Sequence, residues 1–92
     1  MSTKEQLRAK YDEHGRMLYR LCVVMLGNVP DAEDALHDTF LRYISHTGRF
    51  ADADHEKAWL IRVAVNICRD MLRKRKRRAV LSPDRLPEAP RS

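Results

Sequence analysis

Large apolar side chains recur at spacings of three and four residues in three separate stretches of this chain, and this pattern constrains the fold most strongly. An α-helix turns by about 100° per residue, so such spacing gathers these side chains on one face. The chain has only 92 residues, which fit one small domain and leave little room for a second. We therefore predict an all-α fold, a small three-helix bundle with room for a short fourth segment, over residues 1–81.

The first helix is expected over residues 4–26. Its apolar stripe consists of Leu7, Tyr11, Leu18, Leu21, Cys22 and Met25. Gly15 interrupts this stripe, and a glycine inside a helix costs about 0.5–1 kcal/mol, so we expect a weak point there. Gly27 and Asn28 are typical of a helix C-terminus, and Pro30 cannot continue the helix.

A second helix is expected to start near Asp31 and to fade over residues 45–48. Its inward stripe is Ala32, Ala35, Leu36, Thr39, Phe40, Tyr43 and Ile44. A loop over residues 47–56 follows, in which we expect Phe50 to anchor in the core. The third helix is predicted to begin between His55 and Ala58 and to continue at least to Arg73. Its inward stripe is Leu60, Val63, Ala64, Ile67, Cys68 and Met71.

The opposite face of the third helix is cationic and carries one aromatic ring and one amide. It consists of Trp59, Arg62, Asn66, Arg69 and Arg73, and a run of five cations follows at residues 74–78. Residues 1–55 carry 7 basic and 9 acidic side chains, whereas residues 56–92 carry 11 basic and 4 acidic ones. This asymmetry favours nucleic acid as the partner of the second half. An anionic membrane surface and a merely solvated face remain the alternatives.

Four acidic residues mark the second helix. Asp31 and Glu33 are explained by the favourable interaction of carboxylates with the start of a helix. Asp34 and Asp38 lie one turn apart and share a face, which fits a protein partner better than DNA. Charge alone still favours, by a narrow margin, an ordinary solvated position for them.

Several classes of function have no support in the residues. Cys22 and Cys68 both fall on apolar stripes, which predicts buried free thiols. The four histidines lie too far apart for a local zinc motif, and neither a glycine-rich phosphate loop nor a nucleophile elbow is present. No apolar run approaches the roughly 18 residues of a membrane span, and residues 1–10 do not read as a secretory signal. We expect a cytoplasmic protein that is not an enzyme and has no metal, cofactor or membrane partner.

Five segments together resemble region 2 of the bacterial extracytoplasmic-function (ECF) sigma factors. They are residues 18–21, 26–28, 31–42, 58–66 and 69–73. The match covers about residues 7–78, in order and with compatible spacing, and several motifs agree. The resemblance implies a promoter-recognition domain that binds core RNA polymerase and the melted minus-ten element.

The resemblance also implies roles for individual residues. Asp34, His37 and Asp38 would face the clamp helices of the largest polymerase subunit; many family members have Gln and Glu at the last two positions. A base flipped from the non-template strand would be captured by Asn66 and by the loop. The loop residues are Thr47, Gly48, Arg49, Asp52, Asp54 and His55. The DNA-binding residues would be Trp59, Arg62, Asn66, Arg69, Arg73, Lys74, Arg75, Lys76 and Arg77.

Residues 82–92 are proline-rich and read as a disordered linker. Family members carry a second, helix-turn-helix domain after this linker, so we expect a chain cut to its N-terminal domain. An anti-sigma factor is a common partner in the family.

Two rival interpretations remain, a regulator that binds duplex DNA and a basic module that binds an acidic protein or a membrane surface.

Overall fold

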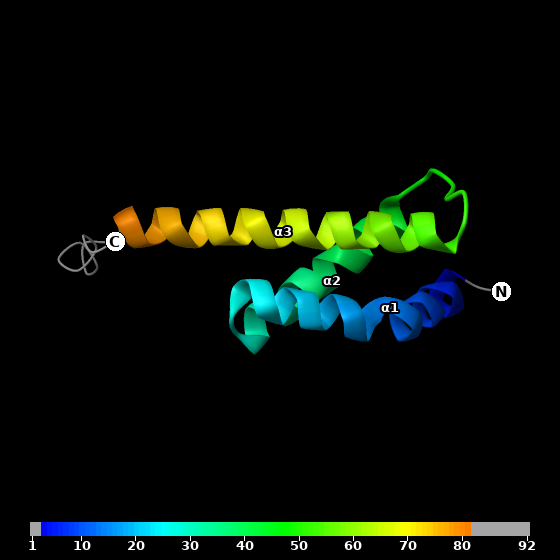
Figure 1. Ribbon diagram of the computed structural model, residues 1–92, viewed down its shortest axis with the longest axis horizontal. Coiled ribbons are helices and arrows are strands. Elements are labelled where there is room, and N and C mark those ends of the chain that lie inside the picture. Colours follow the sequence, from blue (N-terminus) through cyan, green and yellow to red (C-terminus); the bar gives the residue numbers. More distant parts are fainter. Residues whose placement is uncertain (1–2, 82–92) are drawn as a thin grey trace.

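The computed structural model describes residues 3–81, which form three helices. They are α1 (Thr3–Leu26), α2 (Val29–Ser45) and α3 (Ala53–Leu81). α1 and α3 run side by side in the same direction, and α2 returns antiparallel to both (Figure 1). The predicted all-α three-helix bundle is confirmed, and the described part of the chain contains no fourth helical segment. The expected linker at residues 82–92 lies outside the described residues.

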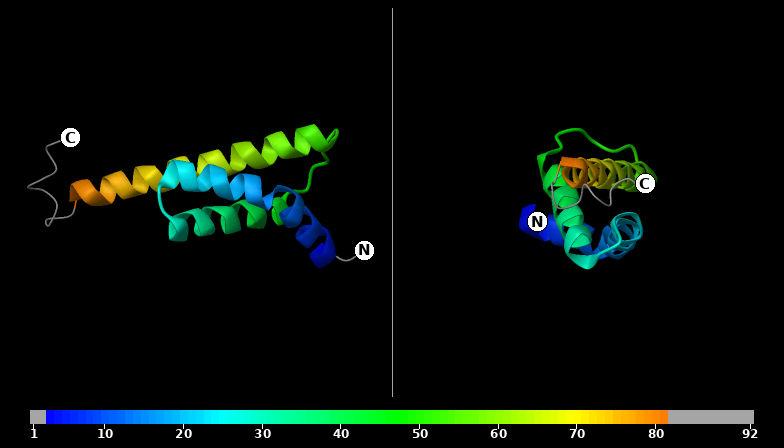
Figure 2. Two further views of the ribbon diagram at one scale, coloured as in Figure 1. Left: turned by 60° about the horizontal axis from the view of Figure 1, so that its bottom comes forward. Right: turned by 90° about the vertical axis from the view of Figure 1, so that its left-hand side faces the viewer.

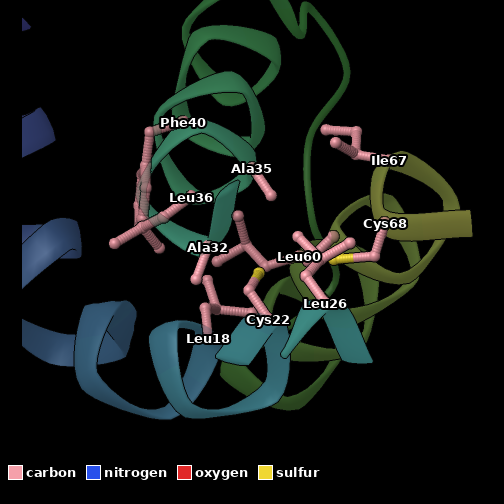
Figure 3. Packing of buried hydrophobic residues seen from close by; sticks show 11 residues of the cluster. Leu18, Cys22, Leu26, Ala32, Ala35, Leu36, Phe40, Leu60, Ile67 and Cys68 are labelled. Carbon is pink, nitrogen blue, oxygen red and sulfur yellow. The ribbon is translucent and has the colours of Figure 1, made fainter. Parts of the chain in front are cut away.

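All three helices contribute to one apolar core (Figure 3). Its buried members are Leu18, Cys22, Leu26, Ala32, Ala35, Leu36, Phe40, Leu60, Ala64, Ile67 and Cys68. Two residues predicted to face inward do not, because Ile44 is 48% exposed and Tyr11 is 47% exposed. Ile44 lies about 80° around the helix from Leu36, at the edge of the inward face. Tyr11 covers the core from outside, with its ring centroid 5.1 Å from that of Phe40.

α1 continues through Gly15 without a break, although its first turns are tilted relative to the rest of the helix (Figure 2). Gly15 is itself buried. A Cβ atom at this position would lie 3.3 Å from the ring of Tyr11. The glycine therefore gives Tyr11 space to lie against the helix.

The corner between α1 and α2 consists of two residues. Gly27 has a φ of 80°, and its N–H donates to the carbonyl of Val23 at 2.8 Å, which ends α1. The Oδ1 atom of Asn28 accepts the N–H of Asp31 at 2.9 Å and so caps α2. Pro30 lies in the first turn, where its missing N–H needs no partner. α2 therefore begins at Val29, two residues before the predicted start.

α3 begins at Ala53, earlier than predicted, because Asp52 caps it. The Oδ1 atom of Asp52 accepts the N–H of His55 at 2.8 Å, and Nδ1 of His55 accepts the N–H of Ala51 at 2.9 Å. The loop therefore shortens to residues 46–52. α3 has 29 residues and a length of about 43 Å, and its end projects past the α1–α2 corner (Figures 1 and 2).

Cys22 and Cys68 are both fully buried free thiols, as predicted. They come from α1 and α3 and meet in the core (Figure 3). Burial and a hydrogen bond with Cys68 raise the pKa of Cys22 to about 12. Burial also raises the pKa of Cys68. Both thiols therefore stay protonated at neutral pH and act as apolar core groups.

Candidate functional site

The outward face of α2 carries the three residues predicted to bind polymerase. Asp34, His37 and Asp38 are all exposed, opposite the buried side chains of Leu36 and Phe40. In the described part of the chain, the side chains of these three residues have neither a hydrogen bond nor an ion pair. We call Asp34, His37 and Asp38 the acidic face. Its two carboxylates are thus exposed and unpaired within residues 3–81.

The sequence interpretation missed an apolar residue on this face. Leu41 lies seven residues after Asp34 and three after Asp38, so it continues the same outward stripe. It is 47% exposed. An exposed leucine beside free carboxylates adds apolar area to a polar surface. Spacing alone could have identified it, because Leu41 is out of phase with the inward residues of α2.

The outward stripe predicted on α3 is largely as expected. Arg62, Asn66, Arg69 and Arg73 are exposed and lie opposite the buried Leu60, Ala64 and Cys68. Arg73 pairs with Asp70, one turn earlier on the same helix. Arg62 and Arg69 have no ion pair within residues 3–81. The stripe therefore presents two free guanidinium groups, one on each side of the Asn66 amide.

Trp59 is set apart from this stripe, because it is half-buried under the loop. Its ring centroid lies 4.6 Å from that of His46, 5.6 Å from that of Phe50 and 6.2 Å from that of Tyr43. The Phe50 ring also stacks on His46 at 4.9 Å. Phe50 is thus half-buried in an aromatic cluster and is not a member of the apolar core, where it was predicted to anchor. The aromatic cluster joins the end of α2, the loop and the start of α3.

The structure divides the cationic run at residues 74–78. Lys74, Lys76 and Arg77 are exposed. Arg75 turns toward the bundle, where Nη1 donates to the carbonyl of Leu26 at 3.1 Å and Nη2 donates to Oδ2 of Asp31 at 2.7 Å. Arg75, although 45% exposed, therefore has partners within the bundle, whereas Lys74, Lys76 and Arg77 have no ion pair within residues 3–81.

The predicted base-capture loop is only partly a loop. Thr47, Gly48 and Arg49 are exposed loop residues, whereas Asp54 and His55 belong to the first turn of α3. Asp52 is engaged in capping that helix. All six residues are exposed, although Asp52 and His55 are also engaged in the contacts that begin α3.

Two cavities flank this loop. One of about 430 Å³ lies between α1, the end of α2 and the loop, and one of about 400 Å³ lies between α1, the loop and α3. Lys10 and Phe50 line both. Asn66 lines neither and lies eleven residues beyond His55, about 16 Å along α3. The structure therefore does not bring Asn66 into these two cavities.

A buried polar network beneath the loop was missed by the sequence interpretation. Glu56 is 7% exposed, and its two oxygens accept hydrogen bonds at 2.8 Å, from Tyr43 Oη and from Lys10 Nζ. His14 is also buried, and its Nε2 lies 3.7 Å from Glu56 without a hydrogen-bond partner. Glu56 lies four residues before Leu60, and His14 lies four before Leu18. The apolar stripes therefore signalled both inward positions.

The network perturbs the pKa values of its members. Burial by itself would raise the pKa of Glu56, but the hydrogen bonds from Lys10 and Tyr43 outweigh burial and lower it. Burial, followed by the hydrogen bond to Glu56, raises the pKa of Tyr43 to about 12. The hydrogen bond to Glu56 raises the pKa of Lys10. At neutral pH the network contains an ionised carboxylate, an ammonium group and a neutral phenol.

Neither a metal site nor a membrane-spanning helix is found in residues 3–81. No group of three or more His, Cys, Asp or Glu side chains there could hold a metal ion. No helix in this range is long and apolar enough to cross a membrane.

A family profile described as Sigma-70 region 2 matches residues 11–78. This chain belongs to the sigma-70 region 2 family. The match spans the acidic face, the loop and the outward stripe of α3. The resemblance to region 2 of ECF sigma factors is confirmed by this match and by the curated relatives.

Those relatives are ECF sigma factors. The region 2 domain is 37% identical over 76 residues to the ECF RNA polymerase sigma factor SigL of Mycobacterium tuberculosis, covering 82% of this chain and 43% of SigL. It is 39% identical over 59 residues to SigW of Bacillus subtilis, covering 64% of this chain and 32% of SigW. The chain thus spans less than half the length of these curated relatives. No solved structure matches it significantly.

Proposed function

We propose that this region 2 domain recognises promoters for RNA polymerase. It docks on the clamp helices of the largest polymerase subunit through Asp34, His37 and Asp38. It binds the non-template strand of the melted minus-ten element through α3 and the loop. The observation that carries the proposal is the separation of two unpaired surfaces of opposite charge, one on α2 and one on α3, in a domain of this family.

The polymerase contact is supported by the state of the carboxylates on α2. Asp31 is already bound to Arg75, whereas Asp34 and Asp38 have no partner in the described chain. Charges without internal partners lose no internal contact when they dock. Leu41 extends the acidic face with apolar area. A basic, partly apolar helical surface would complement it, and charge complementarity of this kind sets specificity and association rate.

The DNA contact is supported by the outward stripe. Arg62 and Arg69 suit backbone phosphates, and Asn66 between them suits a base edge. At the loop, a cavity of about 400 Å³ lined by Arg49, Phe50 and Asp52 is large enough for one flipped base. We assign base capture to the loop cavities and a separate base-edge contact to Asn66, since the two lie about 16 Å apart along α3.

The proposed role is binding rather than catalysis, and it places the domain in the cytoplasm, where bacterial RNA polymerase works. An anti-sigma factor would be a third partner, competing for the same two surfaces. The two rival interpretations predict different ligands. A duplex-binding regulator would prefer double strands, and a basic interaction module would bind without using the acidic face.

The test is binding of purified core RNA polymerase by the domain. Asp34→Lys together with Asp38→Lys should abolish binding, because charge reversal opposite a basic surface is strongly unfavourable. The matched control is Glu5→Lys with Asp12→Lys, which makes the same charge change at two exposed positions on α1. Helicity should be unchanged in both. Binding that survives in the folded Asp34/Asp38 variant would refute the docking role.

A second measurement distinguishes residues of α3 that recognise a base from residues that bind only phosphates. Arg69→Ala should weaken binding to all single strands and reduce the log–log salt slope by about 0.7. Asn66→Ala should leave the slope nearly unchanged and remove about 1–3 kcal/mol of discrimination between strands that differ at one base. If Asn66→Ala weakens binding to both strands equally, Asn66 does not recognise a base and is only part of a solvated face.

A further inference from the structure

We infer that Arg75 is a positioning residue that fastens α3 to the α1–α2 corner and does not contact DNA, unlike the cations that flank it. The inference deepens the proposed function, and its DNA arm rests on that proposal. It removes Arg75 from the expected phosphate contacts and gives the residue a different role.

The contacts of Arg75 join all three helices. Its Nη1 reaches the carbonyl of Leu26, the last residue of α1, and its Nη2 reaches the carboxylate of Asp31 in the first turn of α2. These partners lie 49 and 44 residues away in the sequence. A planar guanidinium suits two acceptors held at a fixed angle, which a lysine could not bind in the same way. We call this set of contacts the corner clamp.

Helix phase explains why Arg75 turns inward. It lies seven residues after Cys68 and four after Met71, so it extends the buried stripe of α3 by one further turn. Arg77, two residues on, is rotated by about 200° and continues the outward stripe of Arg69 and Arg73. Arg77 is exposed and has no ion pair within the described residues. Phosphates that reach the outward stripe would therefore meet Arg77 and not Arg75.

The corner clamp also fixes the direction in which the end of α3 projects. The end of α3 projects past the α1–α2 corner (Figures 1 and 2), and Arg75 ties this projecting end to the corner. The same clamp ends on Asp31, three residues before Asp34 of the acidic face. Arg75 thus fixes the position of the projecting cations of α3 relative to the start of α2, the helix that we propose binds polymerase.

The first test is a salt titration of single-stranded DNA binding for wild type, Arg75→Gln and Arg77→Gln. The two variants each lose one positive charge and lie two residues apart. Arg77→Gln should lower the log–log slope by about 0.7, whereas Arg75→Gln should leave it unchanged. An equal drop in both variants would overturn the inference. If neither variant changes the slope, the DNA role of Arg77 fails, and the second test decides the clamp independently.

The second test measures position directly and needs no DNA. Spin labels at Glu33→Cys and Val80→Cys report the distance from α2 to the end of α3, while Cys22 and Cys68 are buried and stay unlabelled. Arg75→Gln should broaden the distance distribution and Arg77→Gln should not. The reciprocal exchange Asp31→Arg with Arg75→Asp should narrow it again relative to Arg75→Asp alone. An unchanged distribution in Arg75→Gln would overturn the clamp.

Discussion

The two ends of this bundle are each held by a carboxylate that connects helices, but in opposite environments. At the loop end, Glu56 of α3 is 7% exposed and accepts hydrogen bonds from Lys10 of α1 and Tyr43 of α2. At the corner, the Asp31 side chain is 37% exposed and binds Arg75. The shortest contacts are nearly equal, at 2.8 Å and 2.7 Å.

Equal distances do not imply equal free energies. An exposed ion pair is screened by water and contributes little to stability, whereas a buried carboxylate that loses its partners is strongly unfavourable. We therefore assign different roles to the two ends. The Glu56 network supports the stability of the fold, and the corner clamp chiefly sets the direction of α3.

The largest effect that would test this comparison is expected from Glu56→Ala. It removes the partner of the Tyr43 hydroxyl and the Lys10 ammonium group, and it should lower the free energy of unfolding by about 2–3 kcal/mol. Urea denaturation followed by circular dichroism measures the loss. Asp31→Ala is the matched variant at the corner and should cost clearly less. Equal losses would mean that burial does not distinguish the two ends.

An intermediate effect is expected from the cap at the corner. Asn28→Ala removes the side-chain acceptor for the N–H of Asp31 and should cost about 1 kcal/mol. Thermal unfolding gives the measurement, and Asn28→Asp, which retains an acceptor, is the control. If Asn28→Ala proves as costly as Glu56→Ala, local capping contributes as much to stability as the buried network.

The smallest effect is expected from acid. The folded pKa of Glu56 lies below its ordinary value of 4.5, so its ionisation favours the folded state above pH 4.5. This contribution is lost as the pH falls through the lower, folded value. The difference between the urea midpoints of wild type and Glu56→Gln should therefore shrink as the pH is lowered from 7 to 3. A constant difference across this range would contradict the assignment.

The sequence predicted the fold because its main determinant is local. Leu18, Cys22, Leu60 and Ala64 lie on their stripes by helical periodicity alone, and all four are buried. The exposure of Asp34 and Arg62 follows from the same periodicity. Glu56 and His14 were missed because no acidic residue or histidine was assigned to the inward faces, although both continue those faces. The start of α3 was predicted late because the capping contact of Asp52 had not been recognised.

Arg75 and Arg77 separate what the sequence determined from what tertiary structure decided. The sequence places these identical side chains on different sides of one helix, since each residue advances the helix by about 100°. It does not show what lies beside each of them. Asp31 and the Leu26 carbonyl meet Arg75 only because the α1–α2 corner packs against α3, 44 and 49 residues away in the chain. Periodicity is a property of the local backbone, whereas the partner of a side chain depends on how separate helices pack together.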